Sequence, residues 1–215
     1  MNLAIMASGR GSNAEAILHA VEQGTLTARV TALICDRGDT GALDVAYKHN
    51  VTSYVVPREQ FASRQDQQER MLELLRAANT EFIALAGFNA ILRPSILSEY
   101  PNRILNIHPS LLPAFGGGIA PEPQAEALRA GVKISGCTVH LVTAIVDAGP
   151  IVAQAAVPVM AKDTVESLSA RILKQEHRIY PIALQWFATN HVTINHGNVS
   201  VDSGVSQALW PNNVR

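Results

Sequence analysis

Short apolar runs alternate with segments of helical periodicity along the first hundred residues. Four runs have the length and composition of strands buried on both faces, and they cover residues 3–7, 30–35, 53–56 and 82–86. Between them, residues 13–23 and 41–49 carry apolar side chains on one helical face. A third helix is predicted after Ser63, where Asp66 completes a capping-box spacing. This alternation predicts a parallel sheet with right-handed connections.

The second half adds three strand candidates. They cover residues 104–107, 138–143 and 151–158, and the first leads directly into His108 and Pro109. The two halves together predict an α/β, Rossmann-like three-layer sandwich. Its sheet is mostly parallel in the N-terminal half and is extended by antiparallel strands and a long helix in the C-terminal half.

Glycines, prolines and capping residues divide this second half. Residues 113–124 contain three glycines and three prolines, which predicts a loop. The spacing of Asp163 and Glu166 is that of a capping box and predicts the start of the long helix. Pro181 is expected to kink that helix or divide it in two, because proline lacks the N–H that a helix interior needs.

Composition narrows the class of protein. The 215 residues are 47% hydrophobic and 16% charged, and 17 Lys and Arg stand against 18 Asp and Glu, so nothing favours nucleic acid or an anionic membrane. The apolar run 82–92 is too short to span a bilayer. Cys35 and Cys137 are far apart, which predicts neither a disulfide nor a cysteine metal site. The N-terminus lacks the basic start of a signal peptide, so we expect a cytoplasmic protein without a bound metal.

A glycine-containing turn, residues 8–13, joins the first strand to the first helix. Free N–H groups at a helix N-terminus favour a phosphate. Gly9 and Gly11 fit a dinucleotide-binding turn, with Asp36 placed to meet a ribose hydroxyl. Alternatively, Gly11, Ser12 and Asn13 could hold a single phosphate, or Ser12 or Asn13 could simply cap the helix. The turn alone leaves these alternatives open.

Asn106 and His108 are two residues apart on a predicted strand, so their side chains point to the same face. Pro109 places His108 at the C-terminal end of that strand, where open α/β sheets bind their ligands. An amide donor beside an imidazolium can stabilise negative charge on a carbonyl oxygen under attack. Asp147, in a loop between two strands, is a candidate for holding the histidine charged and oriented, although an Asp before Ala-Gly is also common in turns.

With these residues in place, the chain resembles the phosphoribosylglycinamide formyltransferase family (glycinamide ribonucleotide transformylases), within the folate-dependent formyltransferase superfamily. The resemblance spans roughly residues 1–190 and rests on four blocks, at residues 8–13, 85–88, 106–113 and 136–151. It implies one formyltransferase domain over residues 1–190. A nucleotide-binding lobe covers about 1–100 and a folate and catalytic lobe about 101–190, with 191–215 as a C-terminal extension of the same domain.

The resemblance also implies substrates and catalytic roles. The amine of glycinamide ribonucleotide attacks the formyl carbon of the co-substrate 10-formyltetrahydrofolate, without metal, nucleic acid or membrane, in a monomer or homodimer. Asn106 and protonated His108 stabilise the oxyanion, and Asp147 supports His108 and helps proton movement. The substrate-binding residues implied are Gly11, Ser12 and Asn13 for the phosphate and Glu176 for the ribose.

Other positions correspond to the family's folate side. The residues implied there are Arg64, Asn89, Ala90, Ile91, Leu92 and Asn106, together with the backbone of 143–147. Asn89 and Ala90 stand where the family often has Met-Arg, which puts one folate contact in doubt. The segment after Pro113 is about three residues longer than usual and lacks the usual basic residues, and Leu173 replaces a frequent polar residue on the ribose side.

Two other functions share part of this pattern. A formyltetrahydrofolate hydrolase would use Asn106, His108 and Asp147 with water in place of the amine, but would not need the turn at 8–13. A non-catalytic nucleotide-binding module would need the turn and Asp36 but would give no reason for Asn106 and His108. His140, near this predicted site, is as compatible with a supporting role as with core packing.

Overall fold

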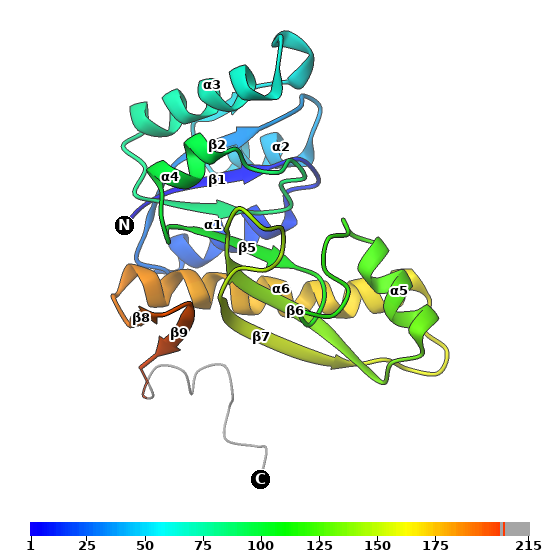
Figure 1. The fold of residues 1–215 in the computed structure, drawn as a ribbon. Helices are drawn as coiled ribbons and strands as arrows, with labels where there is room; N and C mark the ends of the chain where they lie inside the picture. The colour runs from blue at the N-terminus through cyan, green and yellow to red at the C-terminus, as the bar shows by residue number, and fades with distance from the viewer. Residues whose placement is uncertain (203, 205–215) are drawn as a thin grey trace.

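A computed structural model describes residues 1–202 and 204 of the chain. Seven strands form one sheet in the order β3-β2-β1-β4-β5-β6-β7 (Figure 1). The first five strands pair in parallel, and β6 and β7 are antiparallel. The strands are β1 (Asn2–Ala7), β2 (Arg29–Cys35), β3 (Ser53–Val55), β4 (Phe82–Leu85), β5 (Ile104–His108), β6 (Ile134–Leu141) and β7 (Ile151–Pro158). The predicted α/β class, with its parallel half and antiparallel extension, is confirmed.

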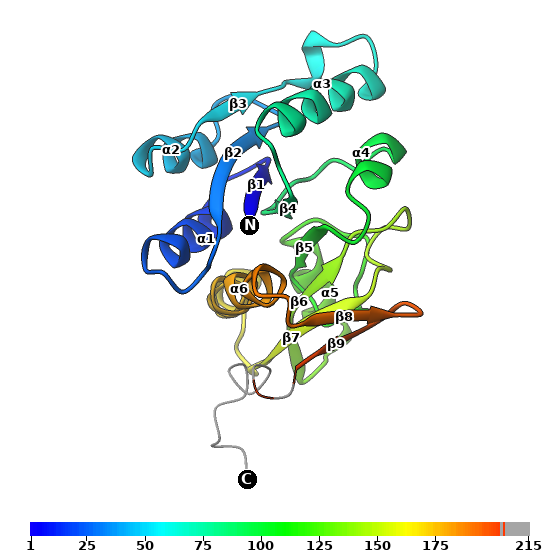
Figure 2. The same ribbon diagram turned by 90° about the vertical axis from the view of Figure 1, so that its left-hand side faces the viewer.

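Helices cover both faces of the sheet (Figure 2). Buried side chains of α1, α2 and α6 belong to one apolar cluster, and those of α3 and α4 belong to a second cluster on the opposite face. The helices are α1 (Ser12–Glu22), α2 (Gly41–Lys48), α3 (Arg64–Ala77), α4 (Pro94–Glu99), α5 (Glu122–Ala130) and α6 (Val165–Ala188), with a 3-10 turn η1 (Arg58–Gln60). Among the described residues, no helix is both long and apolar enough to cross a membrane.

The C-terminal segment beyond α6 forms a small antiparallel hairpin of β8 (Val192–Asn195) and β9 (Asn198–Val201), and β9 contacts β7. The sequence pattern there is weak, so this hairpin was not predicted as such. The remainder of the predicted extension, residues 203 and 205–215, lies outside the described residues.

Helix α6 begins and continues differently from the sequence prediction. Its N-terminal capping box is formed by Thr164 and Ser167, one residue later than the predicted Asp163 and Glu166. Asp163 instead accepts hydrogen bonds from the Arg171 guanidinium at 2.7 Å. The helix runs without a break through Pro181. The local cost of an interior proline, about 3 kcal/mol, is outweighed here because the surrounding helix face is buried in the core.

The predicted loop 113–124 is also shorter in the structure. Helix α5 begins at Glu122, with Pro123 in its first turn. Proline is tolerated there because the first-turn N–H groups have no helical acceptor in any case. Within the predicted loop, the irregular segment is therefore confined to about residues 113–121.

One buried side chain joins the long helix to two central strands. The hydroxyl of Tyr180, on α6, lies 3.1 Å from the Leu85 carbonyl and 2.9 Å from the Leu105 carbonyl. Tyr180 is fully buried. The long helix is thereby held against the C-terminal end of β4 and the first half of β5.

Candidate active site

The C-terminal ends of β1, β4 and β5 border a cavity of about 860 Å³. The chain winds outward from β1 to β3 and then returns to β4 on the other side of β1, so the strand order switches direction between β1 and β4. Such a switch point leaves a crevice that ligands of open α/β sheets occupy. Residues of the glycine turn, the end of β5 and the long loops of the antiparallel half all line this cavity.

The glycine turn forms one end of the cavity. Gly11 is the N-cap of α1 in a left-handed conformation, with φ at 81°, and no side chain caps the helix. The alternative in which Ser12 or Asn13 acts as the cap is therefore wrong. A Cβ on Gly11 would lie 2.6 Å from the Ala42 Cα, so only glycine lets the turn pack against α2. The first N–H groups of α1 lack helical acceptors and are available to an anion.

Asn13 joins this turn to the C-terminal helix. Its side-chain nitrogen donates a 2.8 Å hydrogen bond to the Glu176 carboxylate, and both residues are buried. Burial raises the pKa of Glu176, while the Asn13 amide and the charge of Arg10 oppose that shift. Asn13 and Glu176, predicted separately as phosphate and ribose residues, thus form one unit at the wall of the cavity.

Asp36 does not take part in this arrangement. It lies 3.6 Å from the Arg37 guanidinium and does not line the cavity. The dinucleotide interpretation of the turn needs an acidic residue at the ribose, and the structure places Glu176 at the cavity instead. This placement of Glu176 and Asp36 favours the single-phosphate interpretation of the turn.

His108 and Asp147 meet at the other end of the cavity. His108 Nδ1 lies 3.2 Å from the Asp147 carboxylate, and His108 Nε2 lies 3.0 Å from the Phe115 carbonyl. Asp147 also accepts a 2.7 Å hydrogen bond from the Gly117 N–H. Both ring nitrogens of His108 therefore face acceptors, an arrangement that suits the doubly protonated ring.

Burial works against that protonated state. Desolvation lowers the pKa of His108, and the Asp147 charge and the Phe115 carbonyl only partly compensate. Burial would raise the pKa of Asp147, but its contacts with His140, the Gly117 N–H and His108 lower it on balance. Asp147 lies beside the His108 ring, as expected. Its negative charge nevertheless raises the pKa of His108 by less than desolvation lowers it.

His140 is a site residue that the sequence analysis did not assign. It is directly opposite Asn106 in the antiparallel pairing of β5 and β6, and its Nε2 lies 3.1 Å from Asn106 Nδ2. His140 Nδ1 lies 3.1 Å from the Leu141 carbonyl, which fixes the orientation of the ring. Asp147 is 3.5 Å away on the same side. The alternation of Thr138 and His140 along β6 was the available signal.

Thr138 holds the chain that follows His108. Its hydroxyl donates to the Ser110 carbonyl at 2.7 Å and accepts from the Leu112 N–H at 3.0 Å. The buried Ser110 hydroxyl in turn donates to the Ala114 carbonyl at 2.6 Å. These bonds fix the exit from β5 and the beginning of the loop that brings Phe115 to His108.

The predicted folate-side residues are split in position. Asn89, Ala90, Ile91 and Leu92 line the cavity after β4, as do Thr143 and residues 145–147. Arg64 is the exposed first residue of α3 and does not line the cavity. Arg10, which the sequence analysis did not select, lines the cavity beside the glycine turn and brings a positive charge to that end.

The formyl transferase family matches residues 1–184. The chain is 34% identical over 202 residues to the phosphoribosylglycinamide formyltransferase of Escherichia coli, covering 94% of each chain. It is 38% identical over 194 residues to the trifunctional purine biosynthetic protein adenosine-3 of Gallus gallus, and it spans only 19% of that protein's length. The crystal structure of glycinamide ribonucleotide transformylase 1 from Symbiobacterium toebii matches with a TM-score of 0.90 and 43% identity, covering 94% of this chain and 93% of that one.

Proposed function

Because this chain belongs to the formyl transferase family, and within it to the phosphoribosylglycinamide formyltransferases, we propose that it transfers a formyl group from 10-formyltetrahydrofolate to the amine of glycinamide ribonucleotide. One observation carries the proposal. The His108–Asp147 pair and the glycine turn at Gly11 border the same cavity. One substrate that carries both an amine and a phosphate could therefore place the amine near His108 and the phosphate at the glycine turn.

The phosphate end supports the ribonucleotide as acceptor. The N-terminal N–H groups of α1, with the Ser12 hydroxyl, hold the phosphate, and Arg10 adds charge. The buried Glu176 carboxylate accepts a hydrogen bond from a ribose hydroxyl while Asn13 fixes its orientation. The substrate amine then extends toward the end of β5.

The opposite wall supports the folate. Ile91 is 66% exposed and Leu92 is buried beneath it, so the segment after β4 presents an apolar edge to a flat ring system. Residues 143–147 supply backbone groups on the facing side. The formyl-bearing nitrogen is thereby brought close to His108 and Asn106.

The reaction needs no covalent enzyme intermediate. The amine nitrogen attacks the formyl carbon, and negative charge develops on the formyl oxygen, which accepts hydrogen bonds from His108 Nε2 and Asn106 Nδ2. The bond between the formyl carbon and the folate nitrogen then breaks. The proton lost by the amine passes by way of Asp147 and water to that nitrogen, so that it leaves as a neutral amine of tetrahydrofolate.

The resting contact between His108 Nε2 and the Phe115 carbonyl occupies the donor that this reaction requires. The formyl oxygen takes the place of the Phe115 carbonyl when both substrates are bound. The charge that develops on that oxygen favours the protonated ring, which offsets the effect of burial on the histidine. Gly116 and Gly117, directly after Phe115, give this segment the freedom to move aside.

Release of tetrahydrofolate, measured with and without glycinamide ribonucleotide, tests the proposal. Release that depends on the ribonucleotide, with formation of N-formylglycinamide ribonucleotide, is the expected result. Release at the same rate without the ribonucleotide would make the protein a formyltetrahydrofolate hydrolase. Binding of nucleotide without any release would leave only a binding module, and either of these two results would overturn the proposed transfer.

A further inference from the structure

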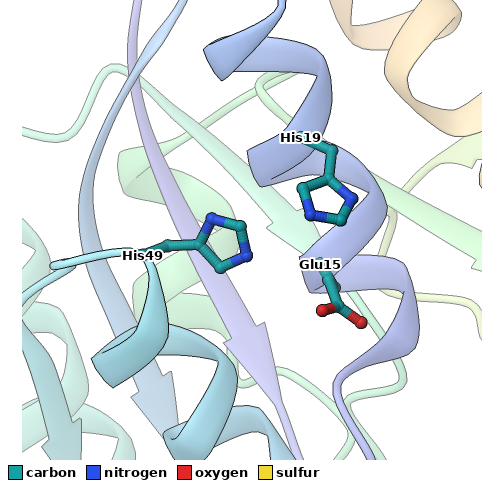
Figure 3. Close-up of side chains that lie close together, drawn as sticks. All are labelled: Glu15, His19 and His49. Carbon is teal, nitrogen blue, oxygen red and sulfur yellow. The ribbon is translucent and has the colours of Figure 1, made fainter.

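Two histidines and a glutamate converge between α1 and the end of α2 (Figure 3). Glu15 and His19 are one turn apart on α1, and His49 is the C-cap residue of α2. One ligand atom from each of the three lies within 4.8 Å of the other two. We propose that Glu15, His19 and His49 form a binding site for a zinc ion that fastens α1 to the end of α2.

The state of the His49 ring is the strongest support. Its side chain is only 4% exposed, and its Nδ1 lies 2.6 Å from the Glu22 carboxylate. A carboxylate accepts, so the proton of the neutral ring is on Nδ1 and the lone pair is on Nε2. Among the residues that the structure describes, this buried Nε2 has no hydrogen-bond partner. An unpaired buried acceptor is costly, and coordination of a cation would satisfy it.

The Glu22–His49 contact also matches a known feature of metal centres. Histidines that bind zinc almost always donate their other ring N–H to a carboxylate or a carbonyl, which fixes the tautomer and strengthens the ligand. Glu22 is in the last turn of α1, on the same side of the helix as Glu15 and His19, because residues seven apart are two turns apart. One helix thus supplies two ligands and the residue that positions the third.

The donor set selects the class of ion. Two imidazoles and one carboxylate form a three-ligand set that zinc takes together with a water molecule. Magnesium and calcium prefer sites made of oxygen atoms alone. The histidine rings are already in contact, with centroids 5.0 Å apart and planes at 65°.

Binding requires a small closure. Ligands of a tetrahedral zinc ion at 2.0–2.1 Å are roughly 3.4 Å apart, so ligand atoms that lie within 4.8 Å of one another must approach by up to about 1.4 Å. Lys48, which donates to Glu15 at 2.7 Å, must also release it. The Lys48 side chain is 62% exposed, so it can turn into solvent without opening the core.

Zinc titration of the metal-free full-length protein, followed by calorimetry and by thermal unfolding, tests the site. We expect one equivalent of zinc to bind with micromolar or tighter affinity, to raise the unfolding temperature and to resist competition by excess magnesium. His108 and His140 also face a carboxylate, so stoichiometry alone does not locate the ion. Variants of the cluster do.

His19→Ala removes an exposed ligand and leaves the fold intact, so it is the decisive variant. It should weaken zinc binding by well over tenfold, and Glu22→Gln, which removes only the positioning carboxylate, by about tenfold. His196→Asn, at an exposed hairpin turn with φ of 49°, is the matched control and should bind zinc normally. Unchanged affinity in His19→Ala, or no binding by the unaltered protein, would overturn the site, whatever the result for formyl transfer.

Discussion

The two ends of the cavity are built by different means. At the proposed phosphate end, backbone N–H groups of α1 are the groups offered to the ligand, and the position of the turn is set by close backbone packing of Gly11 against Ala42. At the other end, His108, Asn106 and Asp147 supply side-chain atoms; Asn106 and His108 are on β5, and loops bring Asp147 and Phe115 to them. Phe115 and Asp147 both have left-handed backbone conformations there, with φ of 56° and 52°.

Because of this difference, we assign substrate binding to one end of the cavity and the chemical step to the other. The phosphate end cannot tolerate an added side-chain atom at Gly11, and its binding groups are mainly backbone N–H groups, to which Arg10 adds a charge. The chemical end depends on protonation and on loops whose residues are in sparsely populated conformations, which is common at functional sites. We expect substitutions at the two ends to change different kinetic constants.

The largest effect is expected from His108→Ala, which removes a donor to the oxyanion at the chemical end. kcat should fall by about 10²–10³ while KM for the ribonucleotide changes little. Asp147→Asn should lower kcat by at least about 10². Steady-state kinetics with both substrates measure this, and His191→Ala, outside the cavity, is the control. Near-normal turnover in His108→Ala would contradict the assigned chemistry.

Gly11→Ala tests the opposite end. The new Cβ would meet the Ala42 backbone at 2.6 Å in a left-handed conformation, so the free energy of unfolding should fall by about 1–3 kcal/mol. KM for the ribonucleotide should rise more than kcat falls. Gly38→Ala, where a Cβ would meet nothing within 4 Å, is the matched control in urea denaturation. Equal stability of the two variants would show that the packing at Gly11 is not decisive.

Arg10→Gln sharpens the comparison without disturbing backbone packing. Arg10 lines the cavity beside the turn, and loss of one charge-assisted contact to a phosphate is expected to raise KM for the ribonucleotide about tenfold. KM for the folate should stay constant. If both KM values rose together, Arg10 would not belong to the phosphate end alone.

The smallest effect is expected on stability, from Asp163 at the start of α6. The Arg171 guanidinium, the Met160 N–H and the Ser167 hydroxyl lower the pKa of Asp163 at the start of α6. A lowered folded-state pKa stabilises the protein at neutral pH, and this contribution is lost as pH falls below about 4. Asp163→Asn should therefore lower the unfolding temperature slightly at neutral pH, and the difference should vanish in acid. Glu73→Gln, in an exposed pair with Arg70, should show neither change.

The sequence predicts the parallel half well because its signals are local. Strands β1, β2, β4 and β5 are short apolar runs, and the Ser63–Asp66 capping box begins α3 as expected. The glycine turn and the position of His108 at the end of β5 also follow from local pattern. The start of α6 was misplaced by one residue because Asp163 and Thr164 are both good capping residues, and only the contact with Arg171 decides between them.

The parts that the sequence could not predict depend on contacts between distant residues. His140 reaches Asn106 only because β5 and β6 pair in one particular register. The hydrogen bond of Asn13 to Glu176 joins residues 163 positions apart. The Phe115 carbonyl reaches His108 because hydrogen bonds of Ser110 and Thr138 fix the course of the loop. The hydrophobic pattern of the sequence does not predict these bonds. Helix α6 also continues past Pro181 because of packing against residues that are distant in the sequence.

The distance along the chain between Asn13 and Glu176 has a consequence for synthesis on the ribosome. The glycine turn is made first and the end of β5 is made midway, but the carboxylate that completes the nucleotide wall is on the last long helix. In the proposed function, a nascent chain therefore cannot bind the ribonucleotide as the finished protein does until α6 has emerged and docked. Ligand binding can therefore stabilise the protein only after nearly all of it has been translated.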